Sequence, residues 1–218
     1  MPKISKKKSC KLTPKEIYDK LKDEFGDPPW WPGDSYIVMV QSILVQNTTW
    51  SSVEKITTSL KKMTPRDVLK MKIEKLEDLI RPCGFCKRKA KTIKYLTEWY
   101  GKYKYNVESV MKIGKTELRK ELLAIKGIGP ETADVILVYV FHKPSFVIDA
   151  YTRRLLERLG FSFKDDSEIR SFFEKGIEKD YKIYGWYHWL ILRQGIEYCK
   201  KKPSCENCPF YDICKRKI

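Results

Sequence analysis

Four cysteines crowd into the last twenty residues of the chain, where their thiolates could bind a metal centre. They are Cys199, Cys205, Cys208 and Cys214. The chain has seven cysteines, an odd number, and no secretory signal precedes them, so a disulfide framework explains them poorly. Four thiolates at this spacing can wrap one [4Fe–4S] cluster, and a tetrahedral zinc ion is the alternative. Because zinc sites typically pair two CxxC-like knuckles and, among these four cysteines, only Cys205 and Cys208 form one, we favour the cluster.

A glycine turn between two expected helices is the second chemical signal. It consists of Lys126, Gly127, Ile128 and Gly129. Pro130 then starts the next helix, since the N–H that proline lacks has no partner in a first turn. Glycines permit positive φ and close approach of another backbone. The exposed N–H groups of such a turn can bind a DNA phosphate, although an ordinary αα-hairpin is the alternative interpretation.

Aromatic residues and one acidic residue complete the candidates. Trp30, Trp31 and Pro32 stand in a proline-rich loop, where paired tryptophans either cover a core or form an aromatic platform. Trp50 is a third aromatic residue near the same segment. Electron-rich rings favour flat, electron-poor or cationic ligands. Asp149 follows three apolar residues, a pattern that predicts the N-cap of a helix.

Helices must position these residues, because almost every periodic segment has helical spacing and no strand–helix alternation occurs. Residues 35–45 are apolar on nearly all sides, which predicts a buried central helix. We expect an all-α fold of two helical lobes with a cleft between them. One lobe spans residues 33–132 and contains the hairpin. The other joins residues 1–32 to 133–218 and holds the cysteine loop at 199–214.

Charge and composition restrict the partners. The formal net charge is +16 over 218 residues, and 42% of the residues are hydrophobic, enough to build a core. Such a surplus suits a polyanionic partner, and the Lys-rich surface of a heat-adapted protein is the alternative. The sequence contains no run of about 18 apolar residues, so it predicts no membrane span. We therefore expect an intracellular monomer, cytoplasmic or nucleoid-associated, without membrane contact.

A family resemblance connects these signals. The pattern L-x-x-I-K-G-I-G-x-x-T-A-D, followed by V-I-D-A-Y-T-x-R, resembles the helix-hairpin-helix DNA glycosylase superfamily and its endonuclease III branch. The W-W-P loop, the Q-N-T segment and K-G-I-G-P-E-T-A-D are similar to the 3-methyladenine DNA glycosylases of that superfamily. The cysteine order resembles endonuclease III, with one residue fewer in the first gap. Because those alkyl-purine relatives often lack the cysteines, this chain would combine their pocket with the endonuclease III tail.

The resemblance also implies roles for individual residues. Asp149 would be the catalytic carboxylate, besides capping a helix. Glu131 occupies the position where bifunctional members have the lysine that attacks the sugar. A carboxylate cannot form an imine, so we expect no abasic-site lyase activity. Gln46 and Phe85 match the two residues that fill the gap left by a flipped base. Their alternative roles are a polar residue at a helix C-terminus and a core anchor.

Together these features predict a monofunctional DNA glycosylase of base excision repair that acts on alkylated purines in double-stranded DNA. One alternative is a mismatch-specific thymine or uracil glycosylase. Another is a DNA-binding module without catalytic activity.

Overall fold

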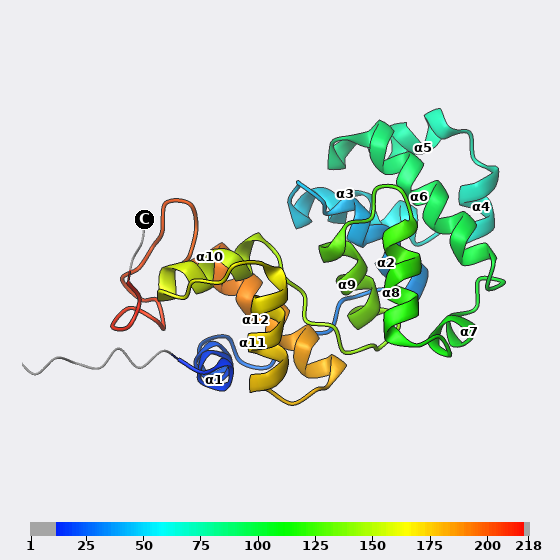
Figure 1. Ribbon diagram of the computed structural model, residues 1–218. Coiled ribbons are helices and arrows are strands. Elements are labelled where there is room, and N and C mark those ends of the chain that lie inside the picture. Colours follow the sequence, from blue (N-terminus) through cyan, green and yellow to red (C-terminus); the bar gives the residue numbers. More distant parts are fainter. Residues whose placement is uncertain (1–11, 216–218) are drawn as a thin grey trace, which may run out of the picture. The chain divides into compact units, whose positions relative to one another are not determined.

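The computed structural model describes residues 12–215, and Figure 1 shows helices joined by loops. Within this range there are twelve α-helices, one short 3-10 turn and no strand, which confirms the all-α fold class. Residues 1–11 and 216–218, at the two ends of the second predicted lobe, lie outside the described residues.

The chain divides into two compact units. The unit that contains the glycine turn, here called the hairpin unit, comprises Trp30–Val147 and Asp180–Gly185. The other, here called the cysteine-loop unit, comprises Met1–Pro29, Ile148–Lys179 and Trp186–Ile218.

Helix α2 forms the centre of the hairpin unit. Nine of its ten residues are buried, as expected for a helix that is apolar on nearly all sides, and it packs against α3, α6 and α9. The elements of the unit are α2 (Ser35–Leu44), α3 (Trp50–Leu60), α4 (Pro65–Lys70), α5 (Ile73–Leu79), the 3-10 turn η1 (Arg81–Cys83), α6 (Cys86–Gly101), α7 (Val107–Met111), α8 (Lys115–Ala124) and α9 (Pro130–Tyr139).

The cysteine-loop unit is built on α1 (Pro14–Phe25), α10 (Ala150–Leu159), α11 (Asp166–Gly176) and most of α12 (Tyr181–Glu197). Helix α1 begins with a reciprocal capping box between Thr13 and Glu16. It packs against α11, and the hydroxyl of Tyr187 on α12 donates to the carbonyl of Pro14 at 2.8 Å. These contacts tie the first helix of the chain to its last two.

Helix α12 begins at Tyr181 and runs to Glu197. Gly185 lies inside the helix, and a Cβ added there would lie 2.7 Å from the ring of Trp30. The glycine therefore makes room for the tryptophan, and the helix continues through it. Helix α7, only five residues long, is too short to show a periodic pattern.

An ion pair with a buried carboxylate holds the two helices of the hairpin together. Asp134 on α9 has no exposed surface. Its Oδ1 accepts from Nε of Arg119 on α8 at 2.8 Å, and its Oδ2 accepts from Nη2 of the same guanidinium group at 3.2 Å. The hydroxyl of Ser145 donates to Oδ1 at 2.7 Å. Three segments thus share one buried carboxylate.

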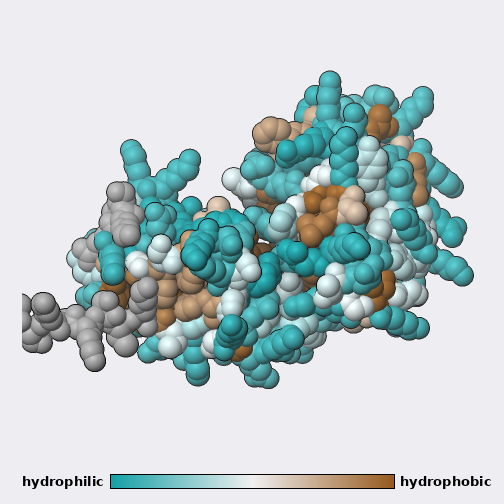
Figure 2. Space-filling model, viewed as in Figure 1, coloured by the Kyte–Doolittle hydropathy of each residue, from teal (hydrophilic) through white to brown (hydrophobic). Residues whose placement is uncertain are grey.

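Hydrophilic side chains cover most of the face in Figure 2, and apolar residues form only separate patches on it. This surface agrees with a chain that carries 44 lysines and arginines. Among residues 12–215, no helix has the length and apolar character needed to cross a bilayer.

Candidate functional site

Asp149 is the N-cap of α10, with 5% of its surface exposed. Its Oδ1 accepts two hydrogen bonds from Thr152, one from the backbone N–H at 2.7 Å and one from the hydroxyl at 2.8 Å. The carboxylate therefore has the capping role that the sequence predicts, and one of its two oxygens performs that role alone.

The second oxygen of Asp149 faces a histidine. Nε2 of His188, on α12 and also buried, lies 3.6 Å from Oδ2. Burial by itself raises the pKa of Asp149, but the neighbouring imidazole of His188 and the hydrogen bonds of Thr152 outweigh it, and the pKa lies below its ordinary value of 3.8. Asp149 is therefore an anion at neutral pH.

Sequence reasoning misses His188, because a histidine within a mainly apolar helix is more often a core residue. The only sequence signal is its rarity, since the chain has two histidines.

The glycine turn uses its two glycines differently. Gly127 adopts φ +97°, and an added Cβ would lie 2.0 Å from Oγ1 of Thr92. Gly129 has an extended backbone with φ −95° and is the N-cap of α9, with open space around it. Lys126 and both glycines are exposed, whereas Ile128 is buried. The turn thus presents backbone and a cation to solvent, as a phosphate site requires.

Glu131 lies in the first turn of α9 and is exposed. The predicted counterpart of the lyase lysine is therefore at the start of the same helix that follows the glycine turn.

The two predicted gap-filling residues, Gln46 and Phe85, have different surroundings. Nε2 of Gln46 donates to the hydroxyl of Thr132 at 2.9 Å and to the carbonyl of Gly127 at 3.3 Å, so its amide contacts the hairpin. Phe85 has 62% of its surface exposed and left-handed backbone with φ +48°. This exposure contradicts the alternative role of Phe85 as a core anchor.

The aromatic residues form two groups around Tyr139. Trp31 meets Trp50 edge-on at 5.4 Å between ring centroids, and its Nε1 donates to the buried Gln41 at 3.0 Å. Trp30 belongs to the second group, in which its ring centroid lies 4.9 Å from that of Tyr139 and 5.9 Å from that of Tyr181. Trp31 also lies 5.2 Å from Tyr139. The structure therefore brings Trp31 and Trp50 together, beside Trp30, while Pro32 is exposed.

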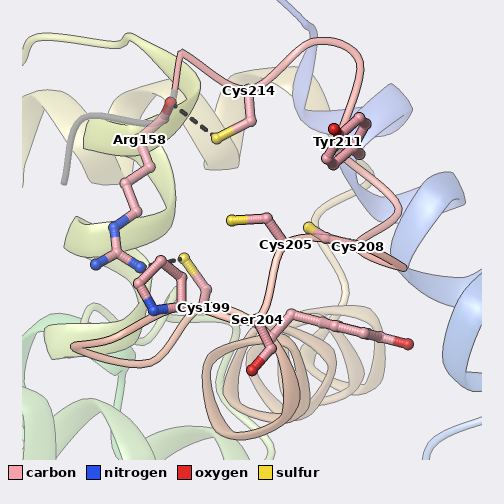
Figure 3. Close-up of a pocket in the computed structure, with 9 residues that line it drawn as sticks. Arg158, Cys199, Ser204, Cys205, Cys208, Tyr211 and Cys214 are labelled. Carbon is pink, nitrogen blue, oxygen red and sulfur yellow. Dashed lines mark hydrogen bonds between the residues drawn. The ribbon is translucent and has the colours of Figure 1, made fainter.

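The four C-terminal cysteines line a single pocket in the cysteine-loop unit (Figure 3). Arg158 donates from its guanidinium to Sγ of Cys199 at 3.2 Å, and Gln194 donates from its amide to Sγ of Cys208 at 3.2 Å. All the cysteines in residues 12–215 are free thiols. No group of three or more His, Cys, Asp or Glu within those residues is arranged to hold a single metal ion.

Known proteins resemble the chain in both sequence and structure. Residues 40–179 match the family described as HhH-GPD superfamily base excision DNA repair protein. A protein of Methanocaldococcus jannaschii, provisionally described as a DNA repair glycosylase, is 42% identical over 93% of this chain and 96% of its own length.

Among solved structures, the H. pylori 3-methyladenine DNA glycosylase bound to 1,N6-ethenoadenine has a TM-score of 0.74 and 29% identity, covering 83% of this chain and 96% of its own. A non-covalent endonuclease III–DNA complex has a TM-score of 0.78 and 26% identity, covering 94% of this chain and 96% of its own. The predicted family resemblance is confirmed.

The different surroundings of Gly127 and Gly129 predict different effects of substitution by alanine. Gly127→Ala places a β-carbon against Thr92 in left-handed backbone, so we expect the free energy of unfolding to fall by about 1–3 kcal/mol, with weaker binding to duplex DNA. Gly129→Ala meets no neighbour and should cost less than about 1 kcal/mol. If Gly129→Ala nevertheless weakens DNA binding in a gel-shift titration, its backbone closely approaches the DNA. Wild-type DNA affinity in both variants would contradict a phosphate site at this turn.

Asp149→Asn separates capping from charge, because asparagine caps a helix as well as aspartate does. We expect a folded protein whose base excision falls by on the order of 10²-fold or more.

The lowered pKa of Asp149 means that its ionised form stabilises the fold above pH 3.8, and that this contribution is lost as the pH falls through the folded-state pKa. Urea titrations should therefore show a difference between wild type and variant at pH 6 that shrinks below pH 3.8.

Proposed function

The chain belongs to the HhH-GPD superfamily of base excision DNA repair proteins, and we propose that it is a monofunctional DNA glycosylase for alkylated purines. The observation that carries this choice of substrate is the edge-on pair of Trp31 and Trp50. An alkylated purine such as 3-methyladenine is flat and positively charged, so tryptophan rings attract it by stacking and cation–π interaction.

The surroundings of the tryptophans divide their roles. Trp30 is packed against Tyr139 and fills the space beside Gly185, so it supports the loop from behind. Trp31 is oriented by its hydrogen bond to Gln41, which leaves its ring to contact a base. The H. pylori relative is bound to 1,N6-ethenoadenine, a modified adenine with an extended flat ring, and this agrees with an aromatic base site.

Asp149 supplies the chemistry in this proposal. As a base leaves, the deoxyribose becomes oxocarbenium-like, and an anion close to it stabilises the developing positive charge. The lowered pKa keeps Asp149 ionised at neutral pH. A carboxylate in this state can also orient or deprotonate the attacking water. A positively charged purine is already a good leaving group, so little acid catalysis is needed.

Glu131 makes the product an abasic site in an unbroken strand. Strand cleavage by family members requires an amine that forms an imine with the sugar, and the carboxylate of Glu131 cannot do so. Lys126 belongs to the phosphate-binding turn and does not replace that amine. We expect Lys126, Gly127, Ile128 and Gly129 to hold the backbone of a double-stranded substrate. The enzyme would act as a monomer.

The cysteine loop suits a [4Fe–4S] cluster. Cys199, Cys205, Cys208 and Cys214 are thiols around one pocket, and two of their sulfurs already accept hydrogen bonds from side chains. When bound, such a cluster would crosslink the loop through four metal–thiolate bonds. Its role would be structural: it would order exposed lysines of the C-terminal segment so that they can face DNA phosphates. These are Lys200, Lys201, Lys202 and Lys215.

Metal analysis tests the cluster independently of activity. Protein purified without oxygen should contain roughly four irons and four sulfides per chain, and Cys205→Ser should lower both. Cys86→Ser, outside the loop, is the matched control and should retain them. Zinc in place of iron would move the site to the alternative.

Single-turnover excision from a panel of duplexes tests the function. The panel contains 3-methyladenine, 7-methylguanine, hypoxanthine, uracil or thymine opposite guanine, and thymine glycol. We expect release of methylated purines, with strand breaks only after alkali and with release by Asp149→Asn slower by on the order of 10²-fold or more. Strand breaks without alkali would contradict the inference from Glu131. Excision of pyrimidines alone would indicate a mismatch glycosylase, and no excision by well-folded protein would indicate a DNA-binding module.

A further inference from the structure

Lys89 on α6 is a lysine with no exposed surface. Its Nζ donates to the carbonyl of Leu44 and to the carbonyl of Cys83, each at 2.8 Å. Burial lowers the pKa of this ammonium, and the charge of Arg88 lowers it further, against an opposing effect of Cys83. Burying a cation is costly unless it is well hydrogen-bonded, and an apolar side chain of similar length would avoid that cost. The buried ammonium of Lys89 is therefore explained by the two carbonyls that it binds.

Both carbonyls end a helical element, where the regular hydrogen-bond partners of the backbone have run out. Leu44 is the last residue of α2 and stands two residues before Gln46. Cys83 is the last residue of η1 and stands two residues before Phe85. One ammonium thus joins the two segments that carry the proposed gap-filling residues.

The backbone of Lys89 holds the second segment as well. Its N–H donates to the carbonyl of Phe85 at 3.0 Å. Phe85 keeps an exposed ring on left-handed backbone, a conformation that persists only when its surroundings fix it. The guanidinium of Arg88 lies over this ring at 5.3 Å from its centroid. Lys89 therefore fixes the backbone on which the exposed ring stands.

We infer that Lys89 is a positioning residue that holds Gln46 and Phe85 at a fixed separation, so that both enter the duplex together when a base is flipped. This inference rests on the proposed glycosylase function. A single ammonium can serve both carbonyls because it has three donors, whereas a neutral apolar side chain would leave the two segments to move separately. A lesion in a single strand leaves no gap to fill, so Lys89 matters only in duplex DNA.

The chain offers a matched control on the same helix. Lys94 donates from Nζ to the carbonyl of Leu69 at 2.8 Å and to that of Met71 at 2.6 Å, at the end of α4. Lys94→Met thus removes two hydrogen bonds of the same kind without touching the segments of Gln46 and Phe85. A general loss of stability should appear in both lysine variants, but a loss of positioning should appear only in Lys89→Met.

The first measurement is the ratio of excision rates for one lesion in duplex and in single-stranded DNA. We expect Lys89→Met to lower this ratio by on the order of 10-fold or more, and Lys94→Met to leave it unchanged. The second uses a duplex with a stable abasic analogue opposite 2-aminopurine, whose fluorescence rises when its stacking is disturbed. Wild type and Lys94→Met should raise the fluorescence, and Lys89→Met should raise it less.

These measurements distinguish the possible failures. The fluorescence assay needs no excision, so a reduced signal in Lys89→Met alone supports the positioning role even if the proposed glycosylase function fails. An unchanged ratio and an unchanged signal in folded Lys89→Met would overturn it. If that variant does not fold, Gln46→Ala, Phe85→Ala and the double variant give the answer in the wild-type background. Residues that act as a unit should show non-additive losses in the ratio, and additive losses would overturn the inference.

Discussion

A carboxylate with no exposed surface, that of Asp134, is the contact on which the geometry of the hairpin unit depends. Arg119 reaches it from α8 and Ser145 from the segment after α9, so none of these segments can move without disturbing a buried charge. Losing the partner of such a charge costs several kcal/mol, far more than a surface ion pair contributes. The turn between α8 and α9 therefore has fixed ends. Gly127 lies in that turn, and Gln46 is attached to its carbonyl.

Elsewhere in the structure, too, a single polar group contacts more than one segment. One oxygen of Asp149 caps α10, which leaves the other to face His188. The ammonium of Lys89 donates to the last carbonyl of both α2 and η1. Polar groups buried in this way must be hydrogen-bonded, so each acts as a geometric constraint as well as a source of charge.

Local signals in the sequence predicted most of the fold. The all-apolar α2 and the proline at the start of α9 each depend on neighbouring residues, and each is present in the structure. Contacts between residues distant in the chain could not be predicted this way. Gly185 accommodates Trp30, and His188 faces Asp149, but no pattern in either local segment indicates its partner. The motifs located the candidate residues, and the structure supplies their surroundings: Asp149 is an ionised helix cap, and Phe85 is exposed. Their roles in excision stay predictions.

The capping role of Asp149 has a consequence for behaviour on heating. Helix ends open more readily than the interior of a domain, because local opening exposes less buried surface than global unfolding does. Asp149 belongs to the first turn of α10, so opening of that turn would displace the carboxylate while the remaining helices stay packed. Thr152, which donates both capping hydrogen bonds, is fully buried and resists this opening. In the proposed enzyme, opening of this one turn on heating would displace the carboxylate before the whole chain unfolds.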